Sequence, residues 1–132
     1  DLTIISKLKE NWIMSKRDNN LLVLDILVSI EKIKEYTYKY TYESFLEDSK
    51  TIDAVIRNFE IIGEAANRLT EDFKEVHPGI NWFRIRGFRN RIVHDYMGID
   101  FQIVWRIIEK DLDKLAKDIA AVINNWLSLG FY

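Results

Sequence analysis

The 132-residue chain contains no cysteine, one proline and five glycines. The absence of cysteine excludes disulfide scaffolds, thiolate zinc sites, iron–sulfur clusters and cysteine nucleophiles. Average usage would supply roughly 16 glycines and prolines, so the chain has too few turn-forming residues for a sandwich, a barrel or many tight hairpins. Because 48% of its residues are hydrophobic, we expect one helical domain with a substantial core.

Long hydrophobic runs are also absent. The longest, Ile119 to Ile123, has five residues, whereas a helix needs roughly 20 to span a bilayer. Residues 1–13 lack the apolar core and the cleavage site of a secretory signal. We therefore expect a soluble, cytoplasmic protein without a membrane partner.

The small net charge excludes a protein that binds nucleic acid through the electrostatic field of the whole molecule. Nineteen Lys and Arg stand against 21 Asp and Glu, for a net charge of −2. Any binding of a polyanion must therefore come from a local basic patch.

Apolar residues recur every three or four positions in four stretches, which predicts four main helices. The predicted helices run from an N-cap at Asp18 to about Tyr36, from about Thr51 to Leu69, from Asn81 to about Asp95, and, as the longest, from Phe101 to Trp126. Pro78 and Gly79 mark a break, a short acidic turn follows Leu69, and Gly98 and Asp100 form a connection and a cap. This pattern predicts an all-α fold, an antiparallel up-and-down bundle of four to five helices.

A cluster of tyrosines follows the first predicted helix. Four of them, Tyr36, Tyr38, Tyr40 and Tyr42, fall within seven positions. We interpret them as wedges that pack a loop against helix ends, with an RNA-stacking surface as the alternative.

Gly63 lies in the middle of the second helix, where glycine costs about 1 kcal/mol relative to alanine. We expect a close approach of another helix at that position.

Four of the eight arginines lie within eight positions, at Arg84, Arg86, Arg89 and Arg91. Arginine suits planar, multi-donor recognition of phosphate, so this cluster favours a phosphodiester substrate. The alternative is a solvated or salt-bridged helix face.

Helical geometry predicts where the polar residues of this cluster point, at about 100° per residue. Arg89 falls on the buried arc marked by the apolar residues, where Glu60 or Glu64 could pair with it. His94 falls about 140° away from Arg89. Either the helix ends or distorts before His94, or a second copy of the chain completes the site, and we favour the second copy.

His94 is the candidate proton-transfer group. In the last turn of the predicted helix, the helix dipole would raise its pKa toward neutrality. His77, beside Pro78 in a loop, is interpreted as structural.

Arg89, Asn90, His94 and Tyr96 form the motif R-N-x-x-x-H-x-Y, which closely resembles the active-site motif of HEPN-domain ribonucleases, in particular the HepT-like toxins. The resemblance covers Met14 to about Asn125, and it extends to Met14–Asp18, Asp53–Asn58, Glu60–Ala65, His77, Pro78, Ile80 and Trp82. It implies one HEPN domain over residues 14–132. Residues 1–13 would be an extra N-terminal segment or a cloning remnant.

The resemblance implies a metal-independent endoribonuclease without cofactors, which dimerises through the motif-bearing helices. The ribose 2′-hydroxyl would attack the adjacent phosphate, with His94 transferring protons, Arg89 stabilising charge and Asn90 orienting the imidazole or binding a phosphate oxygen. Arg91 would bind RNA. Arg84 and Arg86 make this segment more basic than is typical of the family, and they would either bind RNA as well or serve only solubility.

The resemblance also implies a partner. In type VII-like toxin–antitoxin pairs the cognate antitoxin is a nucleotidyltransferase, which would neutralise the toxin by attaching AMP to Tyr96. The alternatives are a non-catalytic subunit that binds a nucleotide or a substrate for a nucleotidyltransferase, and a purely structural helical dimer.

Overall fold

The computed structural model describes residues 2–94 and 98–129, except the side chains of residues 2, 5–17 and 94. Three long helices form the body of the fold: α1 (Leu2–Thr37), α3 (Ser49–Arg68) and α8 (Leu112–Leu129). Shorter helices connect them: α2 (Tyr42–Leu46), α4 (Glu71–Val76), α5 (Trp82–Arg86), α6 (Phe88–Ile92) and α7 (Phe101–Lys110). The strands β1 (Val93–His94) and β2 (Gly98–Ile99) pair antiparallel. The predicted all-α class is confirmed.

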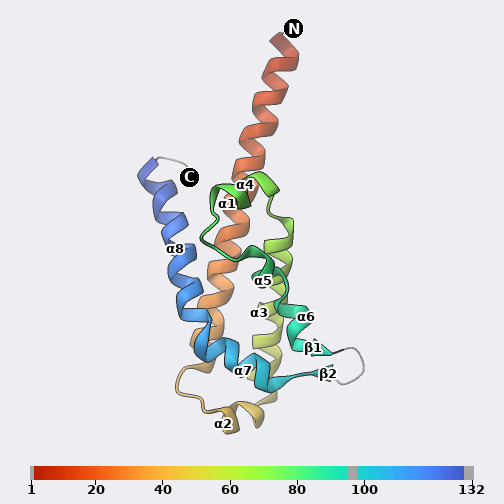
Figure 1. The fold of residues 1–132 in the computed structure, drawn as a ribbon, viewed down its shortest axis with the longest axis vertical. Coiled ribbons are helices and arrows are strands. Elements are labelled where there is room, and N and C mark those ends of the chain that lie inside the picture. The colour runs from red at the N-terminus through yellow and green to blue at the C-terminus, as the bar shows by residue number, and fades with distance from the viewer. Residues whose placement is uncertain (1, 95–97, 130–132) are drawn as a thin grey trace.

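The core lies where α1 packs between α3 and α8 (Figure 1). Ile26, Ile30 and Ile33 of α1 are fully enclosed, and so are Val55 and Ile62 of α3. Their spacing of three, four and seven residues places each set on one face of its helix. Each such side chain stabilises the fold by about 1.5–3 kcal/mol relative to exposure, so this contact holds the bundle together.

Helix α1 differs from its predicted bounds. It begins at Leu2 rather than at Asp18, because residues 2–17 contain neither glycine nor proline and continue the helix upstream. Its first turns project beyond the other helices (Figure 1). With 36 residues α1 is also longer than the predicted fourth helix, which divides at Asp111 into α7 and α8.

The connections contain more helix than the sequence pattern predicts. Tyr42–Leu46 forms α2, because Thr41 and Ser44 make a reciprocal capping box. The acidic turn after Leu69 becomes α4, capped by Thr70. The Asn19 side chain fixes this cap to α1 through two hydrogen bonds, of 3.0 and 3.1 Å, with Thr70.

The four tyrosines divide into two kinds, with Tyr36 and Tyr38 exposed and Tyr40 and Tyr42 in contact with other side chains. The Tyr40 hydroxyl donates to the Asp48 carboxylate at 2.5 Å, and the Tyr42 ring lies 6.3 Å from the Trp105 ring. These two fulfil the predicted wedge role. Tyr38 does not, since it is 72% exposed with the Lys39 ammonium 5.5 Å from its ring centre.

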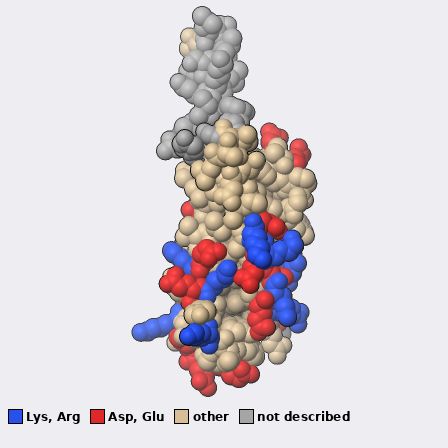
Figure 2. Space-filling view, turned by 90° about the vertical axis from the view of Figure 1, so that its left-hand side faces the viewer, with Lys and Arg blue, Asp and Glu red and all other residues tan. Residues whose placement is uncertain are grey.

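Among the described helices, none is long and apolar enough to cross a membrane. The face on the side of α8 carries acidic and basic side chains intermixed over its lower half and few charges above (Figure 2). That face therefore presents no field of one sign.

Candidate functional site

The arginine-rich segment is anchored at its start by an aromatic cluster. Trp82, the first residue of α5, donates from its indole nitrogen to the His77 carbonyl at 3.1 Å. The Phe73 ring lies 5.9 Å from the Trp82 ring and 4.7 Å from that of His77. Burial lowers the pKa of His77 below its ordinary value of 6.5. These contacts agree with the structural role predicted for His77.

Gly63 allows α5 to lie close against α3, as predicted. A Cβ atom added at Gly63 would lie 3.4 Å from the carbonyl oxygen of Arg86. One turn farther along, the rings of Phe59 and Phe88 meet edge to face, with centres 5.8 Å apart. Both α5 and α6 are thereby fixed to the most regular helix of the bundle.

The predicted single helix from Asn81 to about Asp95 is wrong. Its start is confirmed, since Asn81 is the N-cap and accepts from the Arg84 backbone N–H at 3.0 Å. The path is interrupted at Gly87, and α6 ends at Ile92. Beyond Ile92 the chain is extended, because Val93 pairs with Ile99 and the Ile92 carbonyl accepts from the Asp100 N–H at 2.8 Å.

Two consequences of the single-helix prediction fail with it. Arg89 is exposed rather than buried, and within the described residues no carboxylate pairs with it. Glu60, one of its two predicted partners, lies 3.7 Å from Arg57 instead. The helix ends before His94, which was the first of the two alternatives left open by the sequence.

His94 lies in β1, where its backbone is paired with Gly98. It is therefore outside the last helical turn, where the sequence pattern placed it. Its side chain lies outside the described residues, and so does Tyr96.

The four arginines of the cluster have different surroundings. Arg84 makes an ion pair of 2.6 Å with Asp111, at the junction of α7 and α8. Arg86 lies over the Phe83 ring, 5.4 Å from its centre. Arg91 has one guanidinium nitrogen, Nη1, that is enclosed and has no hydrogen-bond partner in the described part of the chain. Arg84 is thus held by the fold, whereas Arg86 and Arg89 are exposed and Arg91 is half-buried.

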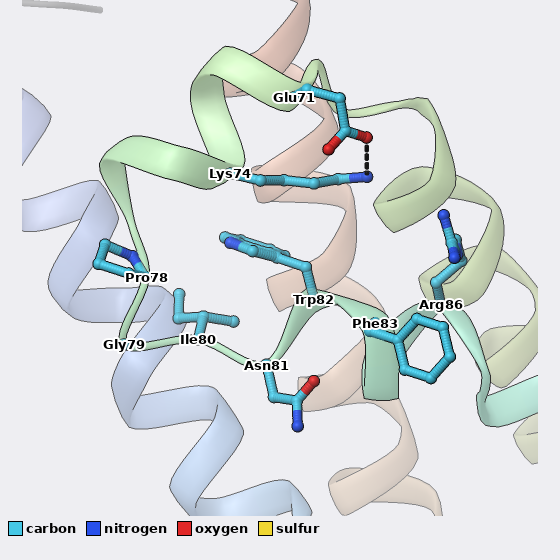
Figure 3. A pocket seen from close by; sticks show the side chains of 9 residues that line it. All are labelled: Glu71, Lys74, Pro78, Gly79, Ile80, Asn81, Trp82, Phe83 and Arg86. Atoms are coloured by element: carbon cyan, nitrogen blue, oxygen red, sulfur yellow. Dashed lines mark hydrogen bonds and ion pairs between the residues drawn. The ribbon is translucent and has the colours of Figure 1, made fainter.

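A cavity of about 540 Å³ opens beside α5. Figure 3 shows Lys74 extending beside Trp82, with Phe83 and Arg86 close together on α5. Sequence reasoning missed Phe83 and Lys74. The available signal for Phe83 was its position three residues before Arg86, which places the two side chains on one helix face.

Comparison with known proteins identifies the family. The family model described as "Ribonuclease HepT-like" matches residues 26–122. The chain belongs to the HepT-like ribonuclease family. This confirms both the family resemblance and the predicted enzyme class, a ribonuclease.

Curated relatives extend the match over most of the chain. "Putative RNase MJ1380" of Methanocaldococcus jannaschii is 38% identical over 109 residues, which cover 83% of this chain and 100% of that protein. "Probable ribonuclease HepT" of Thermococcus cleftensis is 40% identical over 100 residues, 76% of this chain and 91% of that protein. No solved structure matches the chain.

Proposed function

We propose that this HepT-like chain is a metal-independent endoribonuclease toxin that cuts RNA by attack of the ribose 2′-hydroxyl. The observation that carries the proposal is the exposure of Arg89 and Asn90 on α6, in a helix that ends just before His94. Arg89 and Asn90 are thereby presented to solvent at a helix end instead of being packed into the core. Selectivity for RNA follows because DNA lacks the 2′-hydroxyl.

The reaction requires one proton acceptor, one proton donor and charge stabilisation. His94 takes the proton of the 2′-hydroxyl as the new O2′–P bond forms, and the resulting imidazolium returns a proton to the 5′-oxygen as the P–O5′ bond breaks. The products are a 2′,3′-cyclic phosphate and a 5′-hydroxyl. Arg89 stabilises the charge that develops on the phosphoryl oxygens, and Asn90 orients the imidazole or binds one of those oxygens.

The other arginines would bind the RNA backbone. Arg91 is half-buried and its Nη1 is enclosed, so it would reach a phosphate only through the rest of its guanidinium group. Arg86 is exposed, and within the described residues no carboxylate lies at ion-pair distance from it. Arg84 would contribute least, because Asp111 already neutralises it.

The experiment that tests the proposal is cleavage of a single-stranded RNA with and without EDTA, by the chain and by its His94→Ala variant. We expect cutting that survives EDTA, leaves cyclic phosphate ends and falls by about 10²- to 10⁴-fold in the variant. Cutting that requires a divalent cation, or that the variant retains, would contradict the mechanism.

We further propose that the site is shared by two copies of the chain, with Arg89 of one copy facing His94 of the other. A mixture of the Arg89→Ala and His94→Ala variants tests this arrangement. Heterodimers would contain one complete site, so mixing two inactive variants should restore a measurable fraction of the activity. No restoration in mixtures shown to exchange subunits would place both residues of a site on one chain.

Control by a partner completes the proposal. A cognate nucleotidyltransferase antitoxin would transfer AMP from ATP to the Tyr96 hydroxyl with release of pyrophosphate. The added bulk and negative charge would compete with RNA for the arginines. Intact-mass measurement after incubation with such an enzyme and ATP should show the mass of AMP on the chain and none on a Tyr96→Phe variant, with cleavage lost only in the modified protein.

A further inference from the structure

Phe83 is the most exposed large apolar side chain among the residues that the structure describes. It is 77% exposed, although its neighbours Trp82 and Ile85 on α5 are buried. An isolated exposed aromatic residue needs no special explanation, but this one has organised surroundings.

A cation lies over the Phe83 ring. The guanidinium carbon of Arg86 is 5.4 Å from the ring centre, within the range of a cation–π contact. Both side chains stand at the edge of the cavity beside α5 (Figure 3). The cavity volume of about 540 Å³ is in the range of small-molecule sites, about 300–1,000 Å³.

The floor of the cavity is fixed. Trp82 is held by its hydrogen bond to the His77 carbonyl. The Lys74 side chain is only 12% exposed, and its ammonium lies 3.4 Å from the Glu71 carboxylate. The ion pair offsets much of the Lys74 charge, so Arg86 supplies the positive charge of the rim.

Phe83 lies on the same outward face as Asn90 of the motif. The N–H of Gly87 donates to the Phe83 carbonyl, and that of Arg91 donates to the Gly87 carbonyl, so the backbone stays close to a helical path across the break. Phe83, Arg86 and Asn90 are all exposed and follow the helical spacing i, i+3, i+7. At the helical rise, Phe83 and Asn90 lie on the order of 10 Å apart along the axis.

We propose that Phe83 and Arg86 form a base-stacking subsite that holds an unpaired nucleobase of the RNA beside the cleaved phosphodiester. This inference rests on the proposed ribonuclease function. Unpaired bases stack on aromatic rings and on guanidinium planes, and the adjacent phosphates complement the charge of Arg86. A strand whose phosphate reaches Asn90 would place a nearby base at Phe83.

A steady-state experiment tests the subsite on the active protein. Phe83→Ala should raise KM for a single-stranded RNA by about 5- to 50-fold, with kcat changed much less. Phe83→Trp, which keeps an aromatic surface, should stay within about twofold of the wild type. Tyr38→Ala is the matched control, because Tyr38 is also an exposed aromatic residue with a cation over its ring. Equal losses from Phe83→Ala and Tyr38→Ala would overturn the subsite.

A binding experiment separates this inference from the cleavage mechanism. A single-stranded DNA carrying 2-aminopurine cannot be cut by 2′-hydroxyl attack, and stacking of the fluorescent base on Phe83 should quench its emission. We expect quenching by the wild type and by Phe83→Trp, and its loss in Phe83→Ala. Quenching by a wild type that cuts no RNA would refute the proposed function and still support the subsite. Quenching unchanged in Phe83→Ala would overturn the subsite even if cleavage is confirmed.

A protein partner is the competing occupant of this surface. If Phe83→Ala leaves KM for RNA unchanged and instead blocks modification by the nucleotidyltransferase, the surface is a docking site for that enzyme and the subsite is wrong.

Discussion

Helix α3 and the segment from Asn81 to Ile99 are neighbours in the fold, and they differ in the regularity of their secondary structure. Helix α3 is one regular helix of 20 residues with a continuous apolar face. The described part of the neighbouring segment, residues 81–94 and 98–99, contains two five-residue helices and two two-residue strands. The proposed chemistry lies entirely on the divided segment. A helix that ends early can direct consecutive polar residues away from the core, which an unbroken amphipathic helix does only along one face.

The largest loss of stability should come from removing a contact between the two regions. Phe59 is 1% exposed and meets Phe88 edge to face. Phe59→Ala should lower the free energy of unfolding by about 3–5 kcal/mol, as measured by urea denaturation. The exposed Phe83→Ala serves as the control and should leave it nearly unchanged. A loss below about 1 kcal/mol for Phe59→Ala would show that α3 is not the support described here.

A substitution in the segment from Asn81 to Ile99 should have the opposite effect. RNA cleavage should fall while the stability of the fold stays unchanged. Arg89→Ala should reduce RNA cleavage by about 10²- to 10³-fold, because the charge on the phosphoryl oxygens loses its donor. Its melting temperature should not change, since Arg89 is exposed. Arg57→Ala, which removes an exposed arginine from α3, should leave cleavage intact. Equal losses from both arginines would indicate a general effect of charge.

Gly63 lies where the two regions meet, and two substitutions at this position should change the stability in opposite directions. Gly63→Ala should stabilise the protein by up to about 1 kcal/mol, because its Cβ meets the Arg86 carbonyl at ordinary contact distance. Gly63→Val should push α5 away and cost about 1–3 kcal/mol. Thermal melts and RNA cleavage measured on both variants would check this, with cleavage reduced only in Gly63→Val. A destabilised Gly63→Ala would mean that α5 lies closer than the distance indicates.

The smallest effect concerns pH and lies away from the site. Hydrogen bonds hold the pKa of Asp48 below its ordinary value of 3.8, chiefly the one from the Tyr40 hydroxyl and then those from Thr51. The folded carboxyl binds its proton less readily than the unfolded one, so this stabilisation is present above about pH 4 and is lost as the pH falls further. Asp48→Asn should therefore lower the melting temperature slightly at pH 7 and by less at pH 3. An equal shift at both pH values would assign the effect to lost hydrogen bonds alone.

The local sequence pattern predicted the features that depend on residues close together in the sequence. The face of α3, the close approach at Gly63, the break at Pro78–Gly79 and the cap at Asp100 all follow from residues within a few positions of each other. The family motif supplied Arg89, Asn90, His94 and Tyr96, whose roles stay proposals.

Interactions between distant residues account for what the pattern missed. The end of α6 depends on pairing of Val93 with Ile99 and of Ile92 with Asp100. Because this pairing ends the helix, Arg89 is exposed and His94 leaves the helix. Arg84 is held by Asp111, which is 27 positions away in the sequence. By residue type Phe83 resembles a core residue, and only its exposure in the fold distinguishes it.

The hydrogen bond between the Asp100 N–H and the Ile92 carbonyl has an evolutionary consequence. Asp100 also caps α7, accepting from the Gln102 and Ile103 N–H groups at 3.1 Å. One residue thus closes the stretch 93–99 and begins the next helix, so both ends of that stretch are fixed to the bundle. Doubling the length of such a closed loop costs only about 0.6 kcal/mol. Insertions between the two ends can therefore lengthen this stretch at little cost in stability while the core stays as it is.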